Sequence, residues 1–276
     1  MSDKDVHTTV AEAYTGALER SREQTATGCC GGANDAPVSQ TAALAGYGEE
    51  AAVHEDAAAS SFGCGNPLAF AGVQKGDTVL DLGAGAGFDL LIAADRVGPE
   101  GHVIGIDMTD AMIDAARENA AKAGFSNVDA RKGLIEDLPV DDASVDWVIS
   151  NCVINLSPEK DRVFAEIHRV LRPGGAFAIS DIVVEDLPAW IREHTQAYVA
   201  CVAGAISESD YVAGLCSAGL DGVEVTDRLV YSADQIKGML AGDFANLGLD
   251  PSTLDADISE VDGKVWSAKF TGRRKD

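Results

Sequence analysis

Cysteine is the residue type in this chain whose chemistry most needs an explanation. Cys152 stands in SNCVINLSPEK, residues 150–160, at the end of a mostly apolar run that predicts a buried strand. Its thiol could be a small buried hydrophobe, a nucleophile or a ligand, and its position alone leaves these readings open. No Cys-x-x-Cys spacing occurs, so the zinc-ribbon and thioredoxin patterns are absent.

The surroundings of the other cysteines favour several thiols that converge in space. Cys64 lies between glycines in GCGNP, which predicts an irregular loop, and Cys201 lies among small residues in YVACVAGAI. Cys29 and Cys30 are adjacent in a Gly-rich stretch, where no structural need for a thiol is evident. Cys216 falls on an apolar helical face, which predicts a core position.

A second chemical pattern is the glycine-rich turn LDLGAGAG, residues 80–87, between an expected strand and an expected helix. Gly83, Gly85 and Gly87 leave room for a ligand to approach the backbone, and the helix offers free N–H groups. Asp107 ends the next strand, 20 positions past Gly87 (107 − 87), where an acid can accept the ribose hydroxyls of an adenosine. The alternative to a cofactor site is that these residues are only turn glycines and a strand-end acid, and that they bind no ligand.

The acid before the turn discriminates between adenosine cofactors. A dinucleotide favours Gly-x-Gly-x-x-Gly, whereas here the spacing is Gly-x-Gly-x-Gly and Asp81 precedes it. A carboxylate is a poor neighbour for phosphate but can hold a cationic amino group. This pattern favours S-adenosylmethionine, whose amino-acid end carries an ammonium group.

The elements that position these residues alternate along the chain. Strands and helices predict a doubly wound, mostly parallel α/β sheet with a Rossmann-like arrangement. The expected strands are 78–83, 102–108, 127–133, 145–153 and 176–184, and the expected helices are 88–97, 109–124 and 158–175. Further helices are expected over 1–20, 189–206, 208–220 and near 233–241, with strands over 222–231 and 264–273.

Three regions are expected from this order of strands and helices. Residues 1–60 form an N-terminal helical and loop extension that carries Cys29 and Cys30, and residues 61–183 form the cofactor-binding domain. Residues 184–276 form a smaller α+β cap that binds substrate.

Composition excludes several classes of function. The chain has 276 residues and a formal net charge of −24, so its surface repels nucleic-acid phosphates and anionic membranes. No apolar run is long enough to span a bilayer, and no basic segment followed by an apolar one starts the chain. We therefore expect a cytoplasmic protein without nucleic-acid or membrane partners, in which stable structural disulfides are not expected.

Several motifs resemble the class I methyltransferase family, namely LDLGAGAGFD, IGIDM and LRPGG. The resemblance implies S-adenosylmethionine as cofactor, lined by Gly83, Gly85 and Asp107, with GLIEDLP beside the adenine. The full set of candidate cofactor-binding residues is Asp81, Gly83, Gly85, Gly87, Asp107, Met108, Leu134, Ile135, Glu136 and Asn151.

Over residues 60–206 the chain more specifically resembles the arsenite methyltransferase family, through GCGNP, SNCVINL, CVAGA and GHVIGIDMT. The resemblance implies that Cys64, Cys152 and Cys201 bind trivalent arsenic and that Cys29 or Cys30 provides a fourth catalytic thiol. It also implies arsenite or thiol-conjugated arsenic as substrate, detoxification as the role, and thioredoxin or glutathione as the reductant. Three thiolates would leave arsenic one lone pair to attack the sulfonium methyl group, without a general base.

Two other functions remain open at this point. A methyltransferase of another small-molecule acceptor would use the same cofactor and keep the cysteines as core residues. A non-enzymatic metalloid binder would use the thiols and leave LDLGAGAG unexplained.

Overall fold

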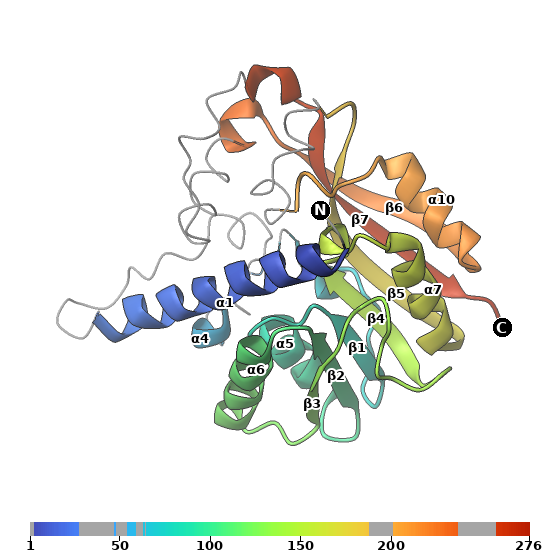
Figure 1. Ribbon diagram of the computed structural model, residues 1–276. Coiled ribbons are helices and arrows are strands. Elements are labelled where there is room, and N and C mark those ends of the chain that lie inside the picture. The colour runs from blue at the N-terminus through green and yellow to red at the C-terminus, as the bar shows by residue number, and fades with distance from the viewer. Residues whose placement is uncertain are drawn as a thin grey trace.

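The computed structural model describes residues 3–27, 47, 54–58, 63, 65–187, 201–236 and 258–276. Its centre is one seven-stranded sheet with the order β3-β2-β1-β4-β5-β7-β6, in which β7 alone runs antiparallel to its neighbours (Figure 1). The strands are β1 (Thr78–Leu82), β2 (His102–Asp107), β3 (Val128–Lys132), β4 (Val145–Asn151), β5 (Leu171–Val184), β6 (Leu220–Val230) and β7 (Val265–Arg274). The expected mostly parallel α/β fold is thereby confirmed.

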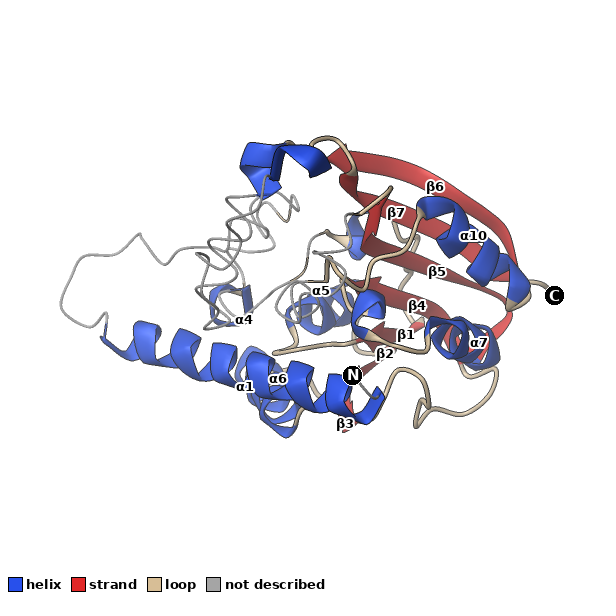
Figure 2. Cartoon of the chain, turned by 45° about the horizontal axis from the view of Figure 1, so that its top comes forward, coloured by secondary structure: helices blue, strands red, loops and turns tan. Residues whose placement is uncertain are grey.

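Helices cover both faces of this sheet (Figure 2). The described helices are α1 (Asp3–Thr27), α4 (Glu55–Ala58), α5 (Phe88–Val97), α6 (Asp110–Ala123), α7 (Lys160–Val170) and α10 (Glu208–Ser217). Short 3₁₀ turns are η1 (Pro67–Ala69), η2 (Ile154–Leu156) and η4 (Ile258–Val261). Among the residues that the structure describes, no helix is long and apolar enough to cross a membrane.

Alternation along the strands explains why both faces are covered. Leu80 and Leu82 point to a cluster with residues of α7 and α10, whereas Val79 points to a cluster with residues of α5 and α6. The strands therefore bury side chains on both faces, as parallel strands between two helix layers must. The same arrangement leaves the carboxyl ends of β1, β2 and β4 at one edge, where such folds bind ligands.

Several predicted boundaries differ from the structure, and two of the differences concern β5 and the turn at Cys201. The helix expected over 158–175 ends at Val170, and β5 begins at Leu171, because the Gly-Gly pair forms an irregularity within the strand rather than a stop between elements. The helix expected over 189–206 does not include its last six residues, which form a turn with Cys201 at φ +62°. Residues 189–200 lie outside the described part.

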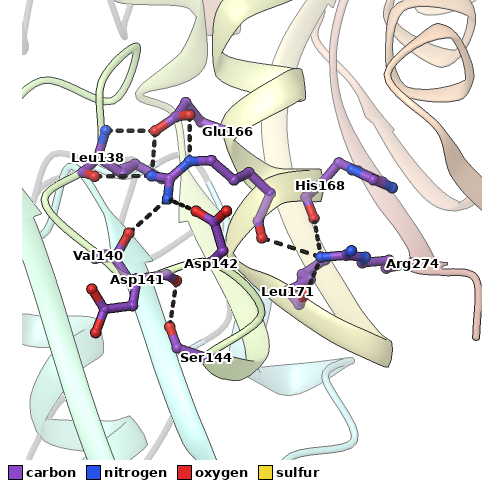
Figure 3. Close-up of polar contacts among 10 residues, drawn as sticks. Leu138, Val140, Asp141, Asp142, Ser144, Glu166, His168, Leu171 and Arg274 are labelled. Carbon is purple, nitrogen blue, oxygen red and sulfur yellow. Dashed lines mark hydrogen bonds and ion pairs between the residues drawn. The ribbon is translucent and has the colours of Figure 1, made fainter.

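Two arginines fix the C-terminal end of α7 (Figure 3). Arg169 forms an ion pair with Glu166 and donates to the carbonyl oxygens of Leu138 and Val140, at 3.0 and 2.8 Å. Arg274, near the chain end, donates to carbonyl oxygens at the end of α7, which satisfies groups that a helix leaves unpaired. These contacts anchor residues 138–142, the segment between Glu136 and β4.

Candidate active site

The carboxyl edge of the sheet contains a cleft, and its walls are the segments that the sequence singled out. The empty space, including the part open to solvent, is about 960 Å³, enough for a ligand of cofactor size. The lining includes nine of the ten candidate cofactor residues: Asp81, Gly83, Gly85, Asp107, Met108, Leu134, Ile135, Glu136 and Asn151. The tenth, Gly87, is not among the lining residues.

The glycine turn is shaped by close contacts that exclude side chains. Gly83 has φ +67°, and a Cβ atom there would lie 2.3 Å from Cγ2 of Val153. Gly85 has φ +53° and donates its N–H to Asp107 over 3.1 Å, which ties the turn to the end of β2. Gly87 has φ +93° and packs against Ala116 of α6, so its requirement for glycine comes from helix packing.

Three carboxylates converge on this end of the cleft, from Asp81, Asp89 and Asp107. Burial raises the pKa of Asp81 well above its ordinary value, and the negative charges of Asp89 and Asp107 raise it further. Burial also raises the pKa of Asp107, although N–H groups of Thr109 and Gly85 oppose this shift. No lysine or arginine is among the described lining residues, so this end of the cleft favours a cation over a phosphate.

The N-terminal helix α1 forms part of the wall of the cleft. His7, Val10 and Tyr14 of α1 line the cleft, and Nε2 of His7 lies 3.0 Å from Oε1 of Glu136. The hydroxyl of Ser157 donates to the same carboxylate oxygen. The amphipathic pattern of residues 1–20 predicted the helix but not its place over the cleft.

The structure brings two of the predicted thiol positions together. Cys152 and Cys201 are both 5% exposed, and the thiol of Cys201 donates to the carbonyl oxygen of Cys152 over 2.9 Å. Both residues have positive φ, +59° and +62°, a conformation that side chains other than glycine rarely adopt. Such strained backbone often accompanies functional positions.

Cys152 is disulfide-bonded in this structure, and its partner lies outside the described residues. The sequence did not predict a disulfide at Cys152, whose thiolate is available as a ligand only when this bond is reduced. Cys64, Cys29 and Cys30 also lie outside the described part, so the structure does not place these three candidates. Gly63 and Gly65, the neighbours of Cys64 in sequence, lie against Asn151 at the carboxyl end of β4 and Ser180 within β5.

Cys216 is exposed on α10, so the prediction that it is a core residue is wrong. Helix α10 buries Tyr211 and Leu215. The apolar residues near Cys216 in sequence extend beyond this buried face, so the apolar pattern did not locate the face correctly. Among the described residues, no group of three or more His, Cys, Asp or Glu side chains is placed to hold a metal ion.

A buried polar network lies behind the turn that follows Cys152. Asn155 donates to Asp181 over 2.8 Å, and Tyr211 donates to the other oxygen of Asp181 over 3.2 Å. Burial raises the pKa of Asp181 to about 7, with opposing contributions from the Ile182 N–H and the Lys160 ammonium. Desolvation lowers the pKa of Lys160, whose Nζ donates to the carbonyl oxygen of Ser157 over 2.9 Å.

Sequence reasoning missed Asp89, His7 and Ser157 as residues of this site. Asp89 follows the glycine turn in the first turn of α5, where an acid is common for helix-dipole reasons, so nothing marked it as part of a cleft. His7 and Ser157 have no motif of their own. Only their place in the fold shows that they meet Glu136.

Comparison with known proteins identifies the family. A model described as "Methyltransferase domain" matches residues 73–237, more than half of the chain. The arsenite methyltransferase of Halobacterium salinarum is 50% identical over 203 residues, which are 73% of this chain and 51% of that protein. The human arsenite methyltransferase is 36% identical over 216 residues, 75% of this chain and 56% of that protein.

A solved structure supports the same relationship. The crystal structure of an arsenic(III) S-adenosylmethionine methyltransferase from Chlamydomonas reinhardtii is 33% identical, with a TM-score of 0.62 over 77% of this chain and 68% of that one. The chain spans about half of the length of the curated relatives that it matches. It belongs to the methyltransferase domain family and, within it, to the arsenite methyltransferase family.

Proposed function

We propose that this chain transfers methyl groups from S-adenosylmethionine to cysteine-bound trivalent arsenic, a reaction that detoxifies arsenite. The observation that carries the proposal is the adjacency of Cys152 and Cys201 at the edge of an acidic, glycine-walled cleft. Relatives that are 36–50% identical to this chain are named arsenite methyltransferases, which supports the proposal.

The cleft fits the proposed cofactor by the chemistry of its donors. Asp81 and Asp89 lie at one end, where buried carboxylates favour an ammonium group, and Asp107 ends β2, where it can accept ribose hydroxyls. Leu134, Ile135 and Met108 offer apolar surface for an adenine ring, next to Glu136. When bound, the cofactor supplies a sulfonium methyl group that is already activated towards nucleophiles.

The chain's own contribution is to bind and orient the substrate. Trivalent arsenic is soft and prefers thiolate ligands, so we assign it to Cys152, Cys201 and Cys64. Each ligating thiol loses its proton, and hydroxyl groups leave arsenite as water when sulfur replaces them. Val6 and Val10 of α1 belong to the apolar cluster around Cys152 and Cys201, which keeps water away from the arsenic lone pair.

A reductant is part of the proposal. Cys152 cannot ligate arsenic while it is disulfide-bonded, so a dithiol such as thioredoxin, or glutathione, reduces it by thiol–disulfide exchange. Methylation formally oxidises arsenic to the pentavalent state. Two thiols, one from Cys29 or Cys30 and one from Cys64, return two electrons to the metalloid and become a disulfide.

Arsenic speciation tests this function. Purified protein is incubated with arsenite, a thiol reductant and S-adenosylmethionine, and the arsenic species are separated by chromatography and detected by mass spectrometry. We expect methylated arsenic with the wild-type chain and none with Cys152→Ser. If the wild-type protein binds the cofactor but forms no methylated arsenic, the proposed substrate is wrong and organic acceptors become the next candidates.

A further inference from the structure

Asn151, the last residue of β4, connects the cleft to the segment around Cys64. Its Nδ2 donates to the carbonyl oxygen of Gly65 over 2.6 Å, and its Oδ1 accepts the N–H of Gly65 over 3.0 Å. The carboxamide therefore pairs with both backbone groups of Gly65, as a neighbouring strand would. Gly65 directly follows Cys64 in sequence, and Asn151 directly precedes Cys152.

The glycines on either side of Cys64 allow this pairing. A Cβ atom at Gly63 would lie 2.2 Å from Nδ2 of Asn151, and one at Gly65 would lie 1.8 Å from Oγ of Ser180. Real Cβ atoms do not come so close to other heavy atoms. The backbone at both positions is thus held directly against Asn151, at the carboxyl end of β4, and Ser180, within β5.

The same carboxamide also contacts a carboxylate of the cleft. Nδ2 of Asn151 lies 3.0 Å from Oδ2 of Asp89 and 2.6 Å from the hydroxyl oxygen of Tyr47. Tyr47 in turn donates its hydroxyl proton to Asp89, with contacts of 2.9 and 3.1 Å to the two carboxylate oxygens. Asp89 and Asn151 both line the cleft.

These contacts compete, because a carboxamide has two N–H protons and Nδ2 faces three acceptors. An ammonium group bound beside Asp89 would neutralise the charge of that carboxylate and make it a weaker acceptor for the Asn151 N–H groups. The two N–H groups of Asn151 are then left for Gly65 and Tyr47. Charge in the cleft therefore strengthens the hold on the backbone beside Cys64.

We propose that Asn151 is a positioning residue that couples cofactor occupancy of the cleft to arsenic binding at the thiols. The inference rests on the proposed function and deepens it, because it states how the cofactor cleft affects ligand binding at the thiols. By thermodynamic linkage, a cofactor that tightens arsenite binding is itself bound more tightly when arsenite is present.

Equilibrium dialysis of the full chain tests the coupling without turnover. The dissociation constant of arsenite is measured for reduced protein with and without saturating S-adenosylhomocysteine, which has the amino-acid ammonium group but no methyl group to transfer. We expect arsenite to bind at least about 5-fold more tightly in its presence, the lower end of usual coupling factors. In Asn151→Ala this ratio falls to about one.

Asn127→Ala is the matched control. The Asn127 carboxamide also holds a glycine turn, through the carbonyl oxygens of Gly98 and Gly101 before β2, at the opposite edge of the sheet from the cleft. Its ratio should equal that of the wild type. A wild-type ratio near one, or an unchanged ratio in Asn151→Ala, overturns the proposal.

A second variant decides the matter if Asn151→Ala does not fold. Tyr47→Phe removes one of the three acceptors, so Asn151 can serve Gly65 and Asp89 at once and the ratio should fall towards one. An unchanged ratio in Tyr47→Phe overturns the proposal. A wild-type protein that methylates arsenite without coupling refutes only the role of Asn151, whereas one that does not bind arsenite refutes the proposed function.

Discussion

The thiol of Cys201 lies 2.9 Å from the carbonyl oxygen of Cys152, although 49 positions separate the two residues in sequence. Each residue sits in a turn with positive φ, one after the end of β4 and the other ahead of α10 in sequence. Two unrelated strained turns thus place two sulfur-bearing residues side by side.

Replacing Cys201 should weaken arsenite binding strongly. Cys201→Ser keeps the size of the side chain but removes a soft thiolate ligand, and we expect the arsenite dissociation constant of the reduced protein to rise by at least about tenfold. Cys216→Ser is the control, because Cys216 is an exposed thiol on α10. Equal affinities of Cys201→Ser and Cys216→Ser would show that Cys201 is not a ligand.

Reduction should switch the protein from inactive to active. Cys152 is in a disulfide, so protein purified without reductant should not bind arsenite, and reduction of that bond should release two thiols. Mass spectrometry after thiol alkylation, run beside an arsenite-binding assay, follows both changes. Full arsenite binding by protein whose Cys152 remains unalkylated would contradict the assignment of Cys152 as a ligand.

Gly83→Ala should damage both stability and cofactor binding. The added Cβ would lie 2.3 Å from Val153, next to Cys152, and φ is +67°, so we expect a loss of about 2–4 kcal/mol in the free energy of unfolding from overpacking and strain.

Gly124→Ala isolates the strain component of this effect. Gly124 has φ +80° at the end of α6, but no atom lies within 4 Å of its ideal Cβ, so only about 1 kcal/mol should be lost. Urea unfolding and binding of S-adenosylhomocysteine measure the two effects. Equal losses in the two variants would show that contact with Val153 does not constrain the turn.

Asp181 should make stability fall as pH rises towards neutrality. Burial raises its pKa from 3.8 to about 7, so between these values the folded state holds a proton that the unfolded state has lost. This contribution is fully present below about pH 4 and is lost as pH rises through 7, by up to about 1.4 kcal/mol per pH unit.

Asp181→Asn removes this titration while keeping a polar side chain for Asn155 and Tyr211. Urea unfolding at several pH values should show that the variant gains stability relative to the wild type between about pH 5 and 7, with no further gain above about pH 8. A difference that does not change with pH would mean that Asp181 is ionised throughout this range.

Much of the cofactor side could be predicted from the sequence because its signals are local. LDLGAGAG joins a strand to a helix, and an acid at the end of the next strand has a fixed place in a parallel sheet, so the turn and Asp107 could be located. The parallel order of β1, β2 and β4 follows from the same alternation. It brings Asn151 to the edge that also holds Gly83 and Asp107.

The parts that could not be predicted depend on long-range contacts. The position of α1 over the cleft rests on His7 and Glu136, 129 positions apart, which share no motif. The turn at Cys201 lies in a run of small apolar residues that fits a helix equally well, and only the packing around Cys152 favours the turn. In the sequence, Asp89 has the pattern of an ordinary acid in a first helical turn, and its contacts with Tyr47 and Asn151 arise only from the fold.

X-ray absorption at the arsenic edge gives the most direct test of the central claim, because it counts the atoms bonded to arsenic. The sample is reduced protein with one equivalent of arsenite, compared with Cys152→Ser and Cys201→Ser. The account predicts three sulfur neighbours in the wild-type protein and fewer in each variant. An arsenic atom surrounded only by oxygen in the wild-type protein would contradict it.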